Sequence, residues 1–447
     1  MRGSQTFIGS VLEAHGLDLA ALAHFFDAPW SAPSSTLSAR TRAIVLNAAA
    51  SCLCTVGRLR EAAEPGESSY RMAIERNDWT DAAREAGNLS RLQLNLGNAA
   101  EAVHRGRESL ILIGRAGEQR QDKAVRVFER MALRIILTDT LLQTSGAQEA
   151  AKVYSETEEV VRALKPFLWM ETELQPDRWK HFPSLIYHFC DFLLAQGRAS
   201  DVVWCAQRAI RAARASNQLL AIALDLVCLG RALTARIRAI HEGADMPYQR
   251  LRHSLGPPGS RSELIQWMLG ARIEAETGIK WSGEPSRTPD EIFEEALDCL
   301  RRSGHDQLLP FGLLARAAYL RGKAEFDGAA RDVNEADRIS RHAETLRWQI
   351  ECHLERTRLL IAQLPQVGAS AACRIGDPTR YSPEQQVTYR HAEATYEEAR
   401  KLIASTGLRR REPELVAARA CLDGESSPLL LDPDCNLHGE PAASFRQ

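Results

Sequence analysis

The stretch that decides the fold is AREAGNLSRLQLNLGNAAEA, residues 83–102. Its apolar residues, Leu89 among them, recur at helical spacing. They lead up to Gly97, which can take the positive φ with which many helices end. Ala102 follows five residues later, where a small side chain lets a second helix pack closely against the first. The stretch therefore predicts a hairpin of two helices.

The same order of an apolar residue, a glycine and a small residue recurs along the chain. The other copies are Leu53-Gly57-Ala62, Leu142-Gly146-Ala151 and Leu193-Gly197, the last followed by Val202 instead of alanine. The glycines are about 40–50 residues apart. One hairpin cannot bury both of its faces, so hairpins of this kind stack on one another. The sequence thus predicts an all-α fold, an α-solenoid of stacked antiparallel helix hairpins.

The composition agrees with a folded, helical protein. The chain has 447 residues, of which 45% are hydrophobic and only 6% aromatic, which favours helices over a β-sandwich. The formal net charge is −2, which argues against a generally basic nucleic-acid-binding protein.

Five segments follow from the pattern along the chain. They are an N-terminal helix and turn-rich joint (1–36), repeats (37–241), a loop-rich insertion with one candidate helix (242–287), further repeats with a loop insertion at 364–381 (288–420), and a loose tail (421–447). Two helix starts are marked by capping boxes, Thr288 with Glu291 and Ser382 with Gln385, each with proline at the first helical position.

Targeting signals are not visible in the sequence. The N-terminal apolar stretch is interrupted by Glu13, His15 and Asp18, unlike a secretory signal. No window reaches 18 uncharged apolar residues. Cysteines are scattered irregularly, which indicates buried thiols in a reducing compartment. We therefore expect a cytoplasmic protein without a membrane span.

Residues 83–102 resemble a tetratricopeptide repeat. Asn88-Leu89-Ser90 stands where that family usually has Asn-Leu-Gly. Leu96-Gly97-Asn98 matches the usual Leu-Gly-Asp turn, and Ala102 matches the small residue of the second helix. The resemblance implies that the first helices of successive hairpins line a concave groove, which binds peptides or helices.

Further phrases are similar to the helical repeat regions of bacterial signal-transducing ATPases of the NACHT or STAND type. They are residues 24–30, 57–65, 78–97, 222–232 and 313–322. This resemblance implies the sensor or scaffold part of a bacterial signalling or defence system. The chain departs from the pattern in three ways: its units exceed the usual length of about 34 residues, Gln93 replaces a common aromatic residue, and no nucleotide-binding module is visible.

No motif of a reaction, cofactor or metal is visible. The nearest match to a phosphate-binding loop, residues 321–324, lacks the first glycine and the hydroxyl that would hold Mg²⁺. The pairs Cys52/Cys54 and His188/Cys190 lie two positions apart in expected helices, where side chains diverge. No alternating βα pattern is present to hold a catalytic cysteine and histidine together. We therefore expect no enzyme, no cofactor and no metal site.

Two basic stretches are interpreted as solvent-exposed. Arg409-Arg410-Arg411 is followed by Glu412 and Glu414, which is typical of a solvated helix end. Residues 250–261 are basic and rich in glycine and proline, as in an exposed loop. A contact with an anion, a nucleic acid or another partner is the alternative interpretation.

In the register of the tetratricopeptide family, the first helices direct polar side chains into the concave groove. The candidate partner-binding residues are Asn47, Arg84, Arg91, Asn95, Gln143, Tyr187, Asp191 and Arg231, with Ser51 and Thr140 beside them. Arg84 and Arg91 lie about two helical turns apart, so both can project from one face. Because guanidinium groups bind carboxylates through two hydrogen bonds, we expect these two arginines to be the strongest contacts.

The sequence therefore predicts a non-enzymatic scaffold or sensor that binds a protein or peptide partner, with no nucleic acid and no membrane involved. Two alternatives stay open. One is a regulatory repeat domain that senses a small effector or a nucleic acid. The other is an enzyme whose site has no motif, which a perturbed ionisable cluster in a deep pocket would favour.

Overall fold

The computed structural model describes residues 15–116, 123–144, 148–153, 155, 183–215, 217–241, 287–365 and 375–425. The predicted helix within 242–287 and Gly146 of the third repeat lie outside the described residues.

The N-terminal half begins with α2 (His15–Ala23) and a short antiparallel pair of strands, β1 (Phe26–Ala28) and β2 (Ala32–Pro33). It continues as α3 (Ala39–Thr55), α4 (Leu59–Glu75), α5 (Trp79–Asn95), α6 (Ala99–Ala116), α7 (Lys123–Thr144), α10 (Pro183–Ala195), α11 (Ala199–Ala215) and α12 (Leu219–His241). Within each hairpin, such as α3 with α4 or α5 with α6, the two helices pack against each other.

The C-terminal half consists of helices and short 3₁₀ turns. These are α15 (Pro289–Arg302), η1 (Asp306–Leu308), α16 (Leu309–Gly322), α17 (Phe326–His342), α18 (Leu346–Gln363), η2 (Pro378–Arg380), α19 (Pro383–Thr406), η3 (Arg409–Arg411) and α20 (Glu412–Leu422). Both predicted capping boxes are present at the starts of α15 and α19. The all-α prediction is confirmed, because β1 and β2 are the only strands in the described part of the chain.

One turn geometry joins most helices. After α3, the Gly57 N–H bonds to the Cys54 carbonyl at 3.1 Å and the Arg58 N–H bonds to the Leu53 carbonyl at 2.8 Å, which is a Schellman motif. Gly57, Gly97 and Gly197 all have positive φ, as the glycine-anchored pattern predicts.

Four further connections between successive helices use the same positive φ without glycine. They contain Asn77, Asn217, Ala324 and Glu344. Turns therefore follow one another about every 20 residues. One hairpin takes about 40 residues, which is longer than the roughly 34 residues of a tetratricopeptide repeat.

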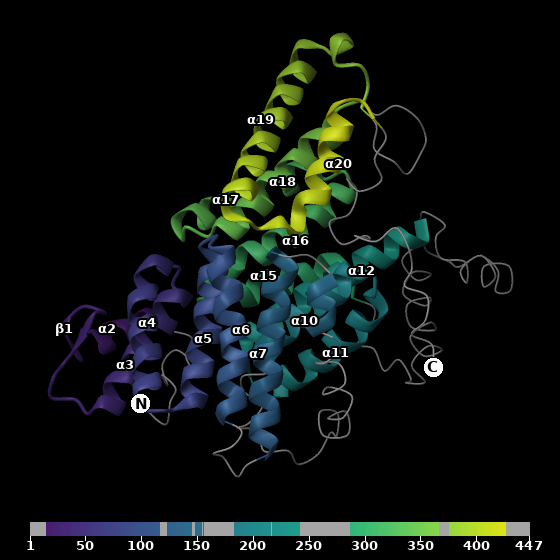
Figure 1. The fold of residues 1–447 in the computed structure, drawn as a ribbon. Coiled ribbons are helices and arrows are strands. Elements are labelled where there is room, and N and C mark those ends of the chain that lie inside the picture. Colours follow the sequence, from purple (N-terminus) through teal and green to yellow (C-terminus); the bar gives the residue numbers. More distant parts are fainter. Residues whose placement is uncertain are drawn as a thin grey trace, which may run out of the picture.

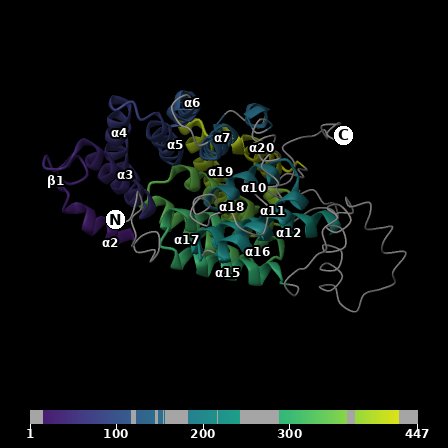
Figure 2. The same cartoon turned by 90° about the horizontal axis from the view of Figure 1, so that it is seen from below.

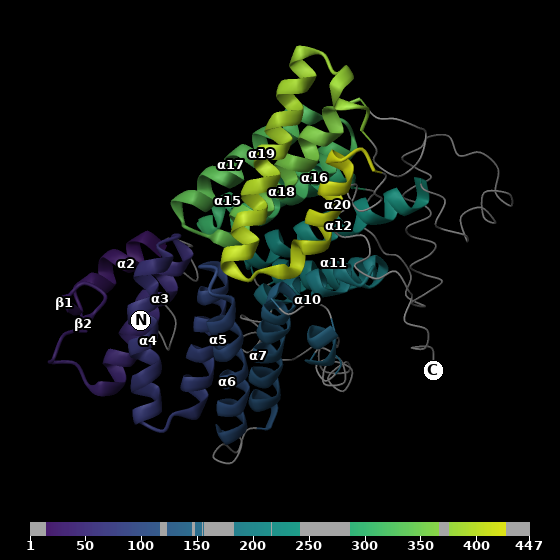
Figure 3. The ribbon, with the colours of Figure 1, turned by 45° about the horizontal axis from the view of Figure 1, so that its top comes forward.

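The two halves of the chain lie against each other. In Figure 1, α3 to α7 stand side by side, and the block from α15 to α20 covers one end of them. Residues far apart in sequence meet at this contact, since α18 touches α5 and η3 touches α7. At Gly97, an added Cβ would lie only 2.7 Å from Thr406 and 2.8 Å from Leu346. The views in Figures 2 and 3 show the same block beside the first helices.

Small residues make the close packing possible. Ala102 is 0% exposed, and the Ser90 hydroxyl of the preceding helix donates to the Ala102 carbonyl at 2.7 Å, so its predicted burial is confirmed. The described cysteines are unpaired thiols, all buried except the half-buried Cys54. No described helix combines the length and apolar character needed to cross a bilayer.

Candidate functional site

Helices α3, α4, α5, α10 and α12 and the residues around η1 line a cavity of about 380 Å³, which we call the central cavity. Polar side chains from α3, α5 and α10 line it, together with two residues near η1. They are Asn47, Ser51, Thr55, Glu85, Asn88, Arg91, Asn95, Tyr187, His305 and Gln307. The cavity thus gathers polar groups from helices that the sequence had placed along one groove.

Glu85 and Asn47 form the buried side of the central cavity. The Asn47 amide donates to the Glu85 carboxyl group, and the Ser51 hydroxyl donates to the Asn47 side-chain oxygen at 3.2 Å. Glu85 is only 4% exposed. This burial raises the pKa of Glu85 to about 7 against the lowering effect of the Arg84 charge. Glu85 therefore exchanges a proton close to neutral pH.

Arg91 supplies the positive charge of the central cavity. Its side chain is half-buried and lines the cavity beside Asn95 and Leu92. Within the part of the chain that the structure describes, Arg91 makes no ion pair or hydrogen bond. Its charge acts on Cys54, whose pKa burial raises to about 12 and Arg91 lowers. A guanidinium group without a counter-charge, at the wall of a cavity, is suited to receive an acidic group.

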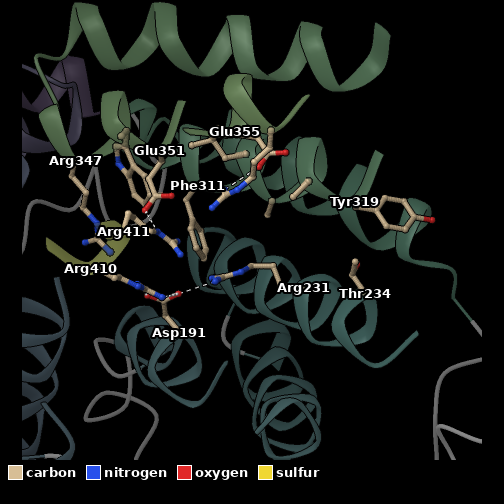
Figure 4. Close-up of a pocket in the computed structure, with 15 residues that line it drawn as sticks. Asp191, Arg231, Thr234, Phe311, Tyr319, Arg347, Glu351, Glu355, Arg410 and Arg411 are labelled. Atoms are coloured by element: carbon tan, nitrogen blue, oxygen red, sulfur yellow. Dashed lines mark hydrogen bonds and ion pairs between the residues drawn. The ribbon is translucent and has the colours of Figure 1, made fainter. Parts of the chain in front are cut away.

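A second cavity, of about 70 Å³, lies where the two halves meet, between α10, α12, α16, α18 and η3 (Figure 4). We call it the arginine pocket. Its charged lining residues are Asp191, Arg231, Arg347, Glu351, Glu355, Arg358, Arg410 and Arg411, and its aromatic ones are Phe311, Tyr319 and Trp348.

Asp191 is held between two arginines. Arg231 donates to it at 2.8 Å and Arg410 donates through both of its Nη atoms, one of them at 3.2 Å. In Figure 4 the two guanidinium groups reach Asp191 from opposite sides. Burial alone would raise the pKa of Asp191, but Arg410 and Arg231 hold it well below its usual value. The carboxylate is therefore ionised at neutral pH.

Behind the arginine pocket, Asp139 of α7 pairs with Arg347 of α18. The two Nη atoms of Arg347 donate to Asp139 at 3.0 and 3.3 Å. The Gln143 amide donates to the same carboxylate at 3.2 Å, and His188 Nδ1 lies 3.1 Å from it. Burial lowers the pKa of His188 more than Asp139 raises it, so the imidazole is neutral at pH 7. This pair links α7 directly to the C-terminal half.

Further ion pairs complete this network on the α16, α18 and η3 side. Glu355 accepts from Arg321 at 2.7 Å and from Arg358 at 3.3 Å. Arg411 donates to Glu351 at 2.7 Å and also pairs with Glu414.

The structure distributes the eight predicted partner-binding residues over separate places. Asn47, Arg91, Asn95 and Tyr187 meet in the central cavity, whereas Asp191 and Arg231 lie in the arginine pocket. Gln143 is buried against Asp139, and Arg84 pairs on the surface with Asp81. These residues therefore do not share one open groove, since α18 touches α5 and η3 touches α7.

The interpretation of Arg409-Arg410-Arg411 as a solvated helix end is also wrong for two of its members. Arg410 and Arg411 are 5% and 7% exposed, and each pairs with buried carboxylates. Only Arg409 is exposed, as expected. The run of three arginines is visible in the sequence, but the sequence does not indicate which distant acids pair with Arg410 and Arg411.

No protein-family model matches the chain, and no curated protein sequence matches it either. The two cavities are therefore the features of the molecule that indicate its function. Within the described residues, no group of three or more histidine, cysteine or acidic side chains comes together as a metal site would require.

Proposed function

We propose that the chain is a non-enzymatic binding module that receives an acidic group of a protein or peptide partner in the central cavity. The observation that carries this proposal is Arg91, which is half-buried, lines the cavity and has no counter-charge among the described residues. A partner carboxylate, from a side chain or a chain terminus, would pair with it through two hydrogen bonds.

The surroundings of Arg91 support this choice of ligand. Asn47, Asn88 and Asn95 place amide groups in the same cavity, and these can bind the backbone of a peptide end. At about 380 Å³ the cavity has the size of ordinary ligand sites, which begin at about 300 Å³. A site of this size takes the end of a chain or a single side chain rather than a long helix.

The fold family and the biological role are also part of this proposal. The Schellman turns and the Leu96-Gly97-Asn98 phrase support a tetratricopeptide-like repeat, and a role as scaffold or sensor in bacterial cytoplasmic signalling or defence accords with that resemblance. The sensing of a small acidic effector is the variant that the burial of the lining favours, because Tyr187 and Glu85 are each 4% exposed.

An enzyme without a motif is the second candidate, and Glu85 favours it. An acid with a pKa of about 7 can give or take a proton at neutral pH. However, the hydrogen bond to Glu85 comes from the Asn47 amide, which is neither a nucleophile nor a proton relay. The geometry therefore supports binding better than catalysis.

The test compares two arginines of the same helix against a synthetic peptide library that carries free C-terminal carboxylates. For the best binder, Arg91→Ala should lower the affinity at least tenfold, about 1.4 kcal/mol. Arg84→Lys is the control, because it keeps the charge that acts on Glu85, and Arg84 is paired with Asp81 outside the cavity, so this variant should keep full affinity. Full binding by Arg91→Ala would refute the proposed site.

A further inference from the structure

The arginine pocket has a composition that the binding of a partner at Arg91 does not explain. Five arginines line it, but only three carboxylates do. The arginines are Arg231, Arg347, Arg358, Arg410 and Arg411, and the carboxylates belong to Asp191, Glu351 and Glu355. A lining with more positive than negative groups favours an anionic ligand.

The geometry of two ion pairs leaves donors unused. Arg347 and Arg410 each bind their aspartate end-on, through Nη1 and Nη2. The Nε–H groups of both arginines are buried and have no hydrogen-bond partner among the described residues. A buried donor without an acceptor costs about 1–3 kcal/mol. Each guanidinium group therefore keeps one Nε–H donor that no described residue uses, and an acceptor can reach it once the atoms packed around it shift.

These donors come from different directions. Arg347 lies at the start of α18, Arg410 lies in η3 and Arg231 lies in α12, and all three line the same pocket. Figure 4 shows their guanidinium groups around one space, with Phe311 beside it. A planar carboxylate offers two oxygens, whereas a phosphate group offers three or four oxygens and a charge of about −1.5 to −2 at pH 7.

We propose that the arginine pocket binds a phosphate group, free or at the end of a small organic phosphate, between the two halves of the chain. The space of about 70 Å³ exceeds the 10–15 Å³ or so that one water needs, so a polyatomic anion has room. Phosphate oxygens accept from the unused Nε–H groups of Arg347 and Arg410, and the negative charge of the phosphate faces the five lining arginines. An organic body, where one is present, lies against the ring of Phe311.

The arginine pocket lies between the two halves of the chain, so a bound ligand should affect how firmly the halves hold together. Arg347 and Arg410 belong to the C-terminal half, and their aspartates belong to α7 and α10 of the N-terminal half. A phosphate that contacts these two arginines and also Arg231 of α12 joins both halves. Phosphate should therefore raise the melting temperature.

The experiment measures binding of inorganic phosphate by calorimetry and by thermal melting, at constant ionic strength with chloride as the reference anion. We expect saturable binding with one site per chain and a higher melting temperature. Phenyl phosphate tests whether the natural ligand is an organic phosphate. If phenyl phosphate binds more tightly than inorganic phosphate, the ligand has an apolar body; if the two bind equally, the ligand is free phosphate. Benzoate binding as tight as phenyl phosphate would overturn the choice of phosphate over carboxylate.

Variants locate the site. Arg347→Lys and Arg410→Lys keep a positive charge beside each aspartate but remove the two unused Nε–H groups, and each should weaken phosphate binding at least tenfold. Arg301→Lys is the matched control, because Arg301 pairs with Glu335 on the surface at 3.0 Å and should bind phosphate as the wild type does.

A third variant covers the case in which the lysine variants do not fold. Ala318→Leu narrows the pocket from α16 without touching an ion pair, since Ala318 is a half-buried lining residue. It should abolish phosphate binding while the helical signal stays unchanged. No binding of phosphate to the wild type, or unchanged binding by Ala318→Leu, would overturn the proposal.

Discussion

The ion pair between Asp139 and Arg347 joins helices that lie on opposite halves of the chain, and its removal should be costly. Their side chains are only 3% and 10% exposed, and two hydrogen bonds connect them. Arg347→Met leaves the Asp139 carboxylate buried with Gln143 and a neutral His188 as its remaining neighbours. Loss of one partner of a buried pair costs about 3–5 kcal/mol.

A surface pair provides the scale for comparison. Arg301 and Glu335 also form an ion pair at 3.0 Å, but their side chains are 46% and 32% exposed. Arg301→Met should cost about 0–1 kcal/mol, as exposed pairs do. The assay is equilibrium urea unfolding followed by circular dichroism in phosphate-free buffer. A loss for Arg347→Met no larger than that for Arg301→Met would refute the reasoning.

The pH dependence gives an independent check of this ion pair. Burial alone would raise the pKa of Asp139, but Arg347 and His188 hold it below its usual value in the folded state. The stabilisation is therefore present above the unfolded pKa of about 3.9 and is lost as the pH falls through the folded value. The difference between wild type and Arg347→Met should be largest near neutral pH and should shrink in acid.

Three further predictions concern the packing, the turns and a buried acid. Ala102→Leu adds methylene groups at a position with 0% exposure and should cost about 1–3 kcal/mol in urea unfolding; an unchanged midpoint would contradict the packing. Ala324→Gly should stabilise the fold by about 0.5–1 kcal/mol, because Ala324 has φ 61° and a left-handed conformation strains an alanine by about 1–2 kcal/mol. The control is Ala330→Gly, inside α17, which should instead destabilise the fold by about 1 kcal/mol. Asp225 is fully buried without a hydrogen bond to any described residue, and burial raises its pKa. The free energy of unfolding should therefore fall by up to about 1.4 kcal/mol per pH unit above a pH of about 3.9. Asp225→Asn should remove this slope, and the same pH profile for the wild type and the variant would contradict the role of Asp225.

Local signals in the sequence were sufficient for the helices and several of their ends. Gly57, Gly97 and Gly197 mark turns because glycine adopts positive φ easily, and the capping boxes at Thr288 and Ser382 are built from adjacent residues. Ala324 and Glu344 make similar turns without such a signal. At these positions the packing of the flanking helices outweighs the local preference of the residue.

The candidate sites depended on contacts that no local pattern contains. Helical periodicity indicates which face of a helix is buried, but not which distant helix covers it. Arg347 meets Asp139 across 208 residues of sequence, and Arg410 meets Asp191 across 219. The sequence therefore placed Asn47, Arg91, Asn95 and Tyr187 on inward-facing helices. Only the structure shows that the C-terminal half packs against these helices and that the residues lie in two separate cavities.

The most direct test of the binding proposal is a thermodynamic cycle between Arg91 and the acidic group of the ligand. The affinity of the best library peptide is measured with its C-terminus free and amidated, against wild type and Arg91→Ala. If Arg91 receives that carboxylate, amidation weakens binding to the wild type at least tenfold and hardly affects binding to Arg91→Ala, a coupling of about 1.4 kcal/mol or more. Losses that simply add would show that Arg91 and the carboxylate do not meet, and would contradict the proposed function.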